Sequence, residues 1–205
     1  MNKRSIWASL LLAALLALPA QAADITPATT MREIRADPAI RASGLYTDIH
    51  TWERDYACFK DAHNDETLEE VVGAASAPSC AAGLNLLVEN CEAGRQVTYK
   101  IYTDEEIAAQ PSRNHAELYY FPAKEAGAKY AVILSGNALV YSGELRGGVS
   151  TAWELHEQGY AVFVLRYRIG KEAGNDAPLD DLGRSVQFIT AHAAAFGVDP
   201  NGYAL

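Results

Sequence analysis

The stretch that decides the fold is residues 130–165, which reads YAVILSGNALVYSGELRGGVSTAWELHEQGYAVFVL. It opens and closes on continuous apolar runs, at 130–134 and 160–165, of the kind that form strands buried on both faces of a sheet. Between them lie a glycine-rich loop and a helical segment at 149–158 that ends at Gly159, a residue typical of helix termini. This order predicts two parallel strands joined by a crossover helix.

Strand and helix patterns also lie on both sides of the stretch at 130–165. Two segments of alternating apolar and polar residues precede it, at 97–102 and 116–121, and each predicts a half-buried strand. After it come an amphipathic helix over 180–196, a turn at 199–202 and a final strand that opens at Tyr203. The sequence therefore predicts an α/β fold, with a mostly parallel sheet, an antiparallel strand pair at its edge and helices on both faces. We expect this sheet to be incomplete within the 205 residues.

The loop at 135–148 is the first place to look for a functional site. Open α/β sheets bind their ligands at the carboxyl ends of the strands. This loop leaves the carboxyl end of the strand at 130–134.

The first 22 residues have the pattern of a signal peptide. Lys3 and Arg4 form a charged start, residues 6–18 an apolar run, and residues 20–22 an A-x-A cleavage site. The apolar run is shorter than the roughly 20 residues of a membrane-spanning helix. We therefore expect an exported protein, periplasmic or secreted, whose mature chain begins near Ala23.

Residues 23–95 differ in pattern from the α/β segment at 97–205 and predict an N-terminal extension. They contain two short helical patterns, one of which runs through 68–73 with Asp65 as a candidate cap. They also hold all three cysteines. Cys80 and Cys91 are a plausible disulfide pair because the segment between them is short and contains Gly83. The pairing among these two and Cys58 stays open, since an odd number leaves one thiol over.

The composition excludes several classes of function. A formal net charge of -9 disfavours binding to nucleic acid and to anionic membrane surfaces, so we expect neither partner after signal cleavage. Dinucleotide and nucleotide motifs and the C-x-x-C spacing are absent, so no cofactor is expected. The acidic run Asp61, His63, Asp65 and Glu69 lacks the glycine of a calcium loop, and we expect no metal site. The oligomeric state stays open.

From Val97 to Leu205 the order of these elements resembles the α/β-hydrolases, specifically the secreted esterase and lipase branch with acetyl- and feruloyl-esterase-like enzymes. The resemblance implies that residues 96–205 are the N-terminal part of an α/β-hydrolase domain and that the substrate is a small-molecule ester. It is carried by the segments at 131–136, 153–155, 159–168, 178–182 and 189–200.

The resemblance assigns a role to the loop after the strand at 130–134. In the family, this loop donates a backbone N–H to the oxyanion that forms during acyl transfer, often from a run of glycines. Here the run reads Gly136-Asn137-Ala138-Leu139. Asn137 and Ala138 are the oxyanion-hole candidates, and Gly136 and Leu139 would shape the substrate loop. The alternative is a loop that only links strand to helix.

The resemblance also places the catalytic serine. In the family, a strand like the one at 203–205 runs directly into a G-x-S-x-G turn, and the acid and the histidine follow it. The whole triad is therefore expected after Leu205, and the chain alone should be inactive. The alternative to a serine carboxylic-ester hydrolase is a non-catalytic exported binding domain, or a degenerate fragment, on the same scaffold.

Five other residues have ordinary explanations. Ser150 lies in a G-x-S-x-A sequence, but a loop rather than a strand precedes it, so it is expected at a helix start. His156 and His192 lie on predicted helices and have packing or solvated roles. Asp180 and Asp181 head a helix, where carboxylates stabilise the positive end of the dipole.

Overall fold

The computed structural model describes residues 24–45, 50–51, 63–136, 139 and 141–205. The predicted signal peptide at 1–22, Cys58 and Asp61 lie outside the described residues. Within the described part of the chain, every helix is too short or too polar to span a bilayer.

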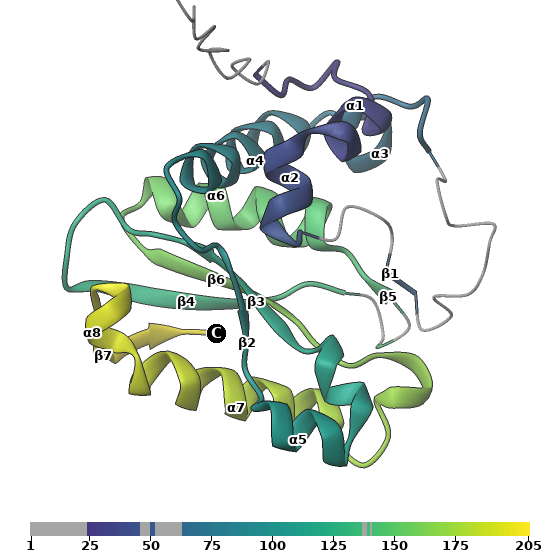
Figure 1. Ribbon diagram of the computed structural model, residues 1–205. Coiled ribbons are helices and arrows are strands. Elements are labelled where there is room, and N and C mark those ends of the chain that lie inside the picture. The colour runs from purple at the N-terminus through teal and green to yellow at the C-terminus, as the bar shows by residue number, and fades with distance from the viewer. Residues whose placement is uncertain (1–23, 46–49, 52–62, 137–138, 140) are drawn as a thin grey trace, which may run out of the picture.

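A five-stranded sheet is the centre of the fold (Figure 1). Three neighbouring strands run parallel to one another, and the other two form an antiparallel pair at one edge. The predicted fold class is confirmed in these respects. The strands, in spatial order, are β2 (Thr98–Lys100), β3 (Glu117–Phe121), β6 (Ala161–Arg166), β4 (Ala128–Leu134) and β7 (Val198–Ala204).

Helices cover both faces of this sheet, and alternate strand residues enter two separate cores. Val162 and Val164 of β6 lie in the core beneath α6 (Ser150–Glu157). Phe163 and Leu165 lie in the opposite core, beneath α7 (Ala177–Ala191) and α8 (Ala193–Phe196). All six residues of β6 are buried, as the continuous apolar run predicts.

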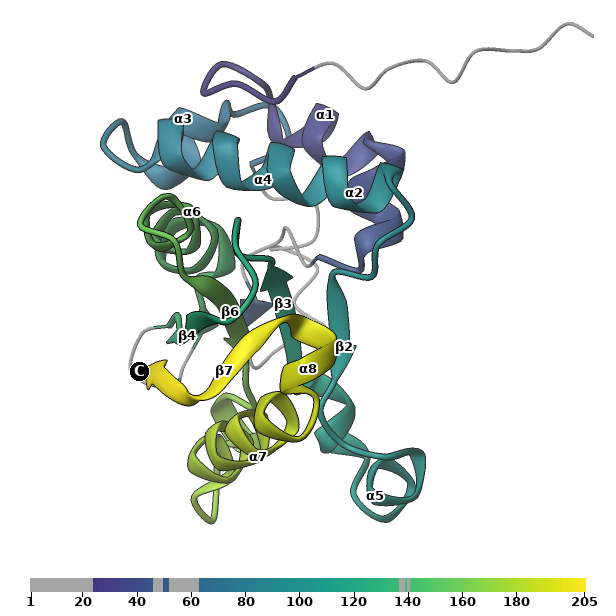
Figure 2. The same cartoon turned by 90° about the vertical axis from the view of Figure 1, so that its left-hand side faces the viewer.

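The N-terminal extension forms a helical layer outside α6 (Figure 2). It holds four described helices where the sequence suggested two, and the longest of them packs against α6. Its apolar residues join the same core as β6, so this layer covers the sheet rather than standing apart from it. The helices are α1 (Met31–Ala36), α2 (Pro38–Ser43), α3 (Leu68–Val72) and α4 (Ala77–Glu92).

The predicted cap of α3 is wrong. Thr67, not Asp65, accepts the backbone N–H at the start of the helix, and Glu70 completes a capping box. Asp65 instead accepts a 2.7 Å hydrogen bond from Arg32 of α1. Gly73 ends the helix as expected.

The predicted disulfide between Cys80 and Cys91 is also wrong. Both cysteines lie on α4 as free thiols. They are eleven positions apart on the helix, about 16 Å along its axis, whereas a disulfide needs Cα atoms within about 7 Å. Gly83 is inside this helix instead of in a loop.

Two strand predictions need correction. β3 is buried at all five positions instead of half-buried, because helices cover both faces of the sheet here. Residues 199–202, predicted as a turn, lie within β7 at an irregularity in its pairing with β4. A hydrogen bond typical of turns is still present there: the Asp199 carboxylate accepts a 2.9 Å hydrogen bond from the Asn201 N–H.

Short elements complete the described chain. The two-residue strands β1 (His50–Thr51) and β5 (Tyr141–Ser142) pair with each other outside the main sheet. The others are α5 (Asp104–Ala109), the 3-10 turns η1 (Pro111–His115) and η3 (Gly170–Glu172), and the π-helical η2 (Glu144–Val149).

Candidate active site

The carboxyl ends of β4 and β6 lie side by side and send out the two loops that form the candidate site. Leu134 pairs with Leu165 at this edge of the sheet. A hydrogen bond joins the loop after β4 to the loop after β6: the Gly170 N–H donates to the Leu139 carbonyl at 2.7 Å. Leu139 has a φ of 61°, which side-chain-bearing residues rarely adopt.

An apolar pocket of about 300 Å³ opens between these loops and the start of α7. Its volume is at the lower end of the range of small-molecule sites. Asp176 is the only charged residue among the described residues that line it. The apolar walls come from Leu134 of β4, Leu139 and Tyr167 of the two loops, and Pro178, Leu179 and Leu182 of α7.

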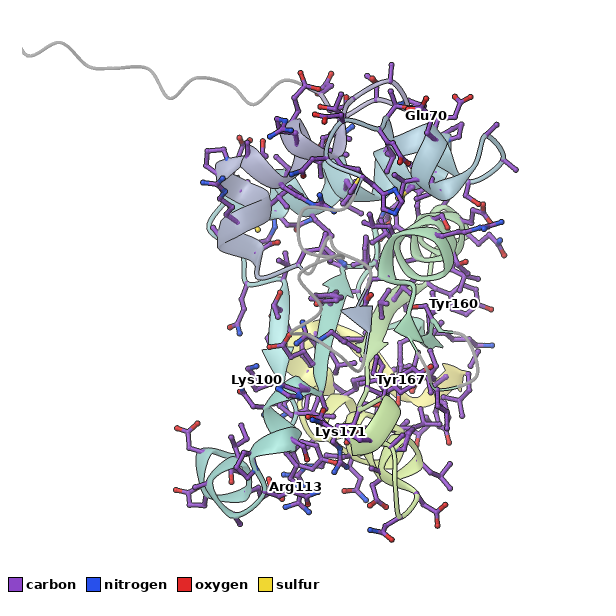
Figure 3. The ribbon with its side chains drawn as sticks, turned by 90° about the vertical axis from the view of Figure 1, so that its right-hand side faces the viewer. Glu70, Lys100, Arg113, Tyr160, Tyr167 and Lys171 are labelled. Atoms are coloured by element: carbon purple, nitrogen blue, oxygen red, sulfur yellow. The ribbon has the colours of Figure 1, made fainter. Side chains whose placement is uncertain are left out.

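The loop after β6 begins at this edge of the sheet. Figure 3 labels Tyr167 and Lys171 on this loop. Tyr167 is buried, and burial raises the pKa of its phenol, with the Glu144 charge adding to the effect. The phenol therefore stays neutral and takes part in the pocket wall as an uncharged group.

The predicted site residues are only partly placed by the structure. Gly136 is exposed directly after β4, and Leu139 is exposed and lines the pocket. Asn137 and Ala138, the oxyanion-hole candidates, lie outside the described residues. Their role stays a prediction.

Two glycines let the loop return close to the sheet. A Cβ on Gly148 would lie 2.8 Å from Val164 Cγ1 and 3.2 Å from Ser135 Oγ. A Cβ on Gly147 would lie 3.3 Å from the Ser135 Cβ. The Gly147-Gly148 pair therefore fixes η2 against the end of β4.

Ser150 occupies a helix start and not a nucleophile turn. It follows η2 instead of a strand, it is 4% exposed, and its hydroxyl donates to the Arg146 carbonyl. A serine nucleophile must stand exposed on a sharp turn after a strand. This geometry agrees with the interpretation of Ser150 as a structural residue.

A buried ion pair holds the loop after β6 against α7. Asp181 is fully buried and accepts from both Nε and Nη2 of Arg168, at 3.0 and 2.7 Å, and from its backbone N–H at 2.9 Å. The Tyr102 hydroxyl also donates a 2.7 Å hydrogen bond to this carboxylate. The sequence prediction of a dipole role misses this function of Asp181, whereas Asp180 does lie in the first turn of α7.

Charge and burial act against each other in this network. Burial alone would lower the pKa of the Arg168 guanidinium, but the hydrogen bonds and charge of Asp181 outweigh it and raise that pKa. Burial raises the pKa of the Tyr102 phenol, and the bond to Asp181 adds to the effect. Arg168 therefore keeps its charge against the Asp181 carboxylate, with Tyr102 neutral beside it.

The histidines have packing roles or lie at the edges of the site. His156 is buried on α6, and burial lowers the pKa of its imidazole. His192 caps α7 by donating from Nδ1 to the Phe188 carbonyl at 2.8 Å. His115 contacts Glu172 of η3 at 2.6 Å.

The described residues contain no cluster of three or more His, Cys, Asp or Glu that could hold a metal ion. In the acidic run, His63 contacts Glu66 at 2.8 Å and Asp65 contacts Arg32 at 2.7 Å. These pairs are solvated, as the charge-run interpretation expects.

Residues 117–205 match the BD-FAE family model, which describes an esterase-like α/β-hydrolase domain. The match confirms the predicted resemblance over this part of the chain. It begins at β3 and includes both loops of the candidate site. The comparison with curated proteins gives no match.

Solved structures similar to this chain are α/β-hydrolases and esterases. An α/β-hydrolase from a Medee basin deep-sea metagenome library is 20% identical, with a TM-score of 0.41 over 43% of this chain and 39% of that one. An acetyl ester-xyloside bifunctional hydrolase from Caldicellulosiruptor lactoaceticus is 17% identical, with a TM-score of 0.47 over 52% and 40%. A thermophilic esterase from Thermogutta terrifontis is 17% identical, with a TM-score of 0.40 over 43% and 34%. The chain thus spans two fifths or less of each of these proteins.

Proposed function

We propose that this protein is an exported serine carboxylic-ester hydrolase, with the described sheet as the N-terminal part of its catalytic domain. The match of residues 117–205 to an esterase-like domain carries the proposal. The apolar pocket at the carboxyl ends of β4 and β6 supports it, because that edge is where α/β sheets bind ligands. The substrate would be a small-molecule ester whose apolar group occupies this pocket.

The roles of the chain in this reaction would be positioning and electrostatic stabilisation. Backbone N–H groups at Asn137 or Ala138 would donate to the oxyanion of the tetrahedral intermediate. The Arg168–Asp181 pair and the bond between Gly170 and Leu139 would hold the two loops in place around the ester. No group in the described site is proposed as the nucleophile.

The nucleophile would follow β7. In esterases of this fold, the strand after the second crossover helix leads directly into the serine turn, and the acid and histidine come later. β7 is the strand in that position, parallel to β4. We therefore propose the triad C-terminal to Leu205. This proposal rests on the family pattern and on the buried, hydrogen-bonded state of Ser150.

A fluorophosphonate probe and p-nitrophenyl acetate test the assignment. The 205-residue chain should show neither labelling nor turnover, and the codons after Leu205 in the source genome should encode G-x-S-x-G. A protein extended through that motif should label, and substitution of its serine by Ala should abolish the labelling. Labelling of the 205-residue chain that Ser150→Ala abolishes would overturn the placement of the nucleophile.

The alternative is a non-catalytic exported domain that uses the same pocket for binding. A stop codon after Leu205, with no labelling of the natural gene product, would favour it. Export itself is tested by N-terminal sequencing of the protein from the producing cell. A start at Ala23 supports signal cleavage, and a start at Met1 with membrane retention contradicts it.

A further inference from the structure

A second cavity of about 470 Å³ lies at the other end of α7 from the candidate active site. The first pocket uses Leu179 and Leu182 near the start of the helix, and the second uses Phe188 and His192 at its end. Leu179 and Phe188 are about 14 Å apart along the helix axis. Figure 2 shows α8 beside β2, and these two elements form the sides of this second cavity.

Four of the residues that line it are aromatic: Tyr99, Tyr120, Phe188 and Phe196. The rings of Tyr99 and Tyr120 pack edge-on against Phe196, with centroids at 5.0 and 4.9 Å, and Tyr99 also contacts Phe188 at 6.3 Å. The Tyr120 hydroxyl donates to the Phe196 carbonyl at 2.7 Å, and the Tyr99 hydroxyl to the Gln96 carbonyl at 3.0 Å. Because both hydroxyl hydrogens are used by the backbone, the tyrosines offer the cavity mainly ring carbon.

One fixed cation stands at the rim. Arg95 is exposed, and its Nε donates to the Asn90 side chain at 2.6 Å. Asn90 is itself buried and held by a 2.6 Å bond to the Leu86 carbonyl, so it orients the guanidinium. Among the part of the chain that the structure describes, no Asp or Glu lines the cavity, although the whole chain carries a net charge of -9. A guanidinium held through Nε keeps its two terminal amino groups for a carboxylate.

We propose that this cavity binds a small aromatic carboxylate. The ring would lie in the cavity against the accessible edges of Tyr99 and Phe188, and the carboxylate would form charge-assisted hydrogen bonds with Arg95. The volume is within the range of about 300–1,000 Å³ for small-molecule sites. The site is separate from the pocket of the proposed reaction, and binding here requires no catalytic residue.

Ligand-observed saturation-transfer NMR on the purified protein tests the charge requirement. The probes are trans-cinnamate and its neutral amide, cinnamamide. Cinnamate should bind more tightly than cinnamamide, and Arg95→Gln should weaken cinnamate by about tenfold or more while leaving cinnamamide unchanged. Arg41→Gln, at another exposed arginine of the helical layer, is the matched control and should change neither. Equal affinity for the two probes, or no binding, would overturn the proposal.

A blocking variant tests the location. Ala195 is exposed on α8 and lines the cavity, so Ala195→Trp should fill it and remove cinnamate binding. Ala194→Trp is the control, because Ala194 is also exposed on the same helix and is not among the residues that line the cavity. A thermal melt of each variant shows whether it is folded. If cinnamate still binds to a folded Ala195→Trp protein, it occupies another site, and the assignment to this cavity is wrong.

Discussion

At the scale of single residues, Asp181 is a carboxylate with no exposed surface. Its fully buried carboxylate depends on Arg168 and Tyr102 for compensation. Asp181→Leu should therefore destabilise the protein by about 3–5 kcal/mol, because it leaves the Arg168 charge buried without a partner. Chemical denaturation measures the free energy of unfolding. Asp180→Leu, on the exposed neighbour, should stay within about 0.5 kcal/mol.

A double variant separates charge burial from packing at this pair. Arg168→Met in the Asp181→Leu background removes the orphaned charge, and it should recover most of the lost stability. If the double variant is no more stable than Asp181→Leu alone, the loss comes from packing and the ion-pair explanation is wrong.

The two described cysteines should differ in reactivity. Burial raises the pKa of the Cys80 thiol to about 12, so the reactive thiolate is scarce, whereas Cys91 is only partly buried. Iodoacetamide should modify Cys91 in the native protein and Cys80 only after unfolding without reductant. Peptide mass spectrometry reads both sites. A peptide pair linked by a Cys80–Cys91 bridge would contradict the helix that separates them.

At the scale of elements, the contact between α4 and α6 depends on a glycine. A Cβ on Gly83 would lie 2.7 Å from the Val149 side chain and 2.9 Å from its carbonyl oxygen. Gly83→Ala should therefore destabilise the protein by about 1–3 kcal/mol through overpacking, although alanine favours the helix itself. Gly183→Ala in α7 has the opposite expectation. No atom lies within 4 Å of its new Cβ, so helix propensity should stabilise by about 0.5–1 kcal/mol. Melting temperatures that shift in the same direction for both would refute the argument.

The elements also show what sequence pattern can and cannot predict. The apolar runs of β4 and β6 were recognisable because burial on both faces imposes a continuous apolar sequence. The sequence does not predict α4, because Gly83 suggests a loop there, and the close approach of Val149 and Trp153 explains this glycine within a helix. Asp181 was assigned to the helix dipole, because its partner Tyr102 is 79 residues away in the chain. Partners at such separations are set by the fold and cannot be read from local spacing.

At the scale of the whole molecule, β7 is an edge strand of the main sheet. It pairs with β4 on one side, and no described strand pairs with its other side. Large apolar side chains are exposed at and near this edge, with Leu134 at 38%, Tyr203 at 51% and Leu205 at 71%. An open strand edge beside apolar surface favours association between copies. The 205-residue chain should therefore self-associate as its concentration rises and should bind the dye ANS.

Sedimentation velocity at low and high micromolar concentration measures this association. Leu205→Lys places a charge at the exposed edge and should shift the distribution toward monomer. Leu179→Lys is the comparison variant, because Leu179 is 67% exposed at the start of α7 and lines the pocket instead of lying on β7, so it should weaken the association less. Equal suppression by both variants would mean that general apolar exposure drives association. A monomer at every concentration, with a sharp reversible melt, would show that the β7 edge needs no further cover, and it would favour the binding-domain alternative over the esterase.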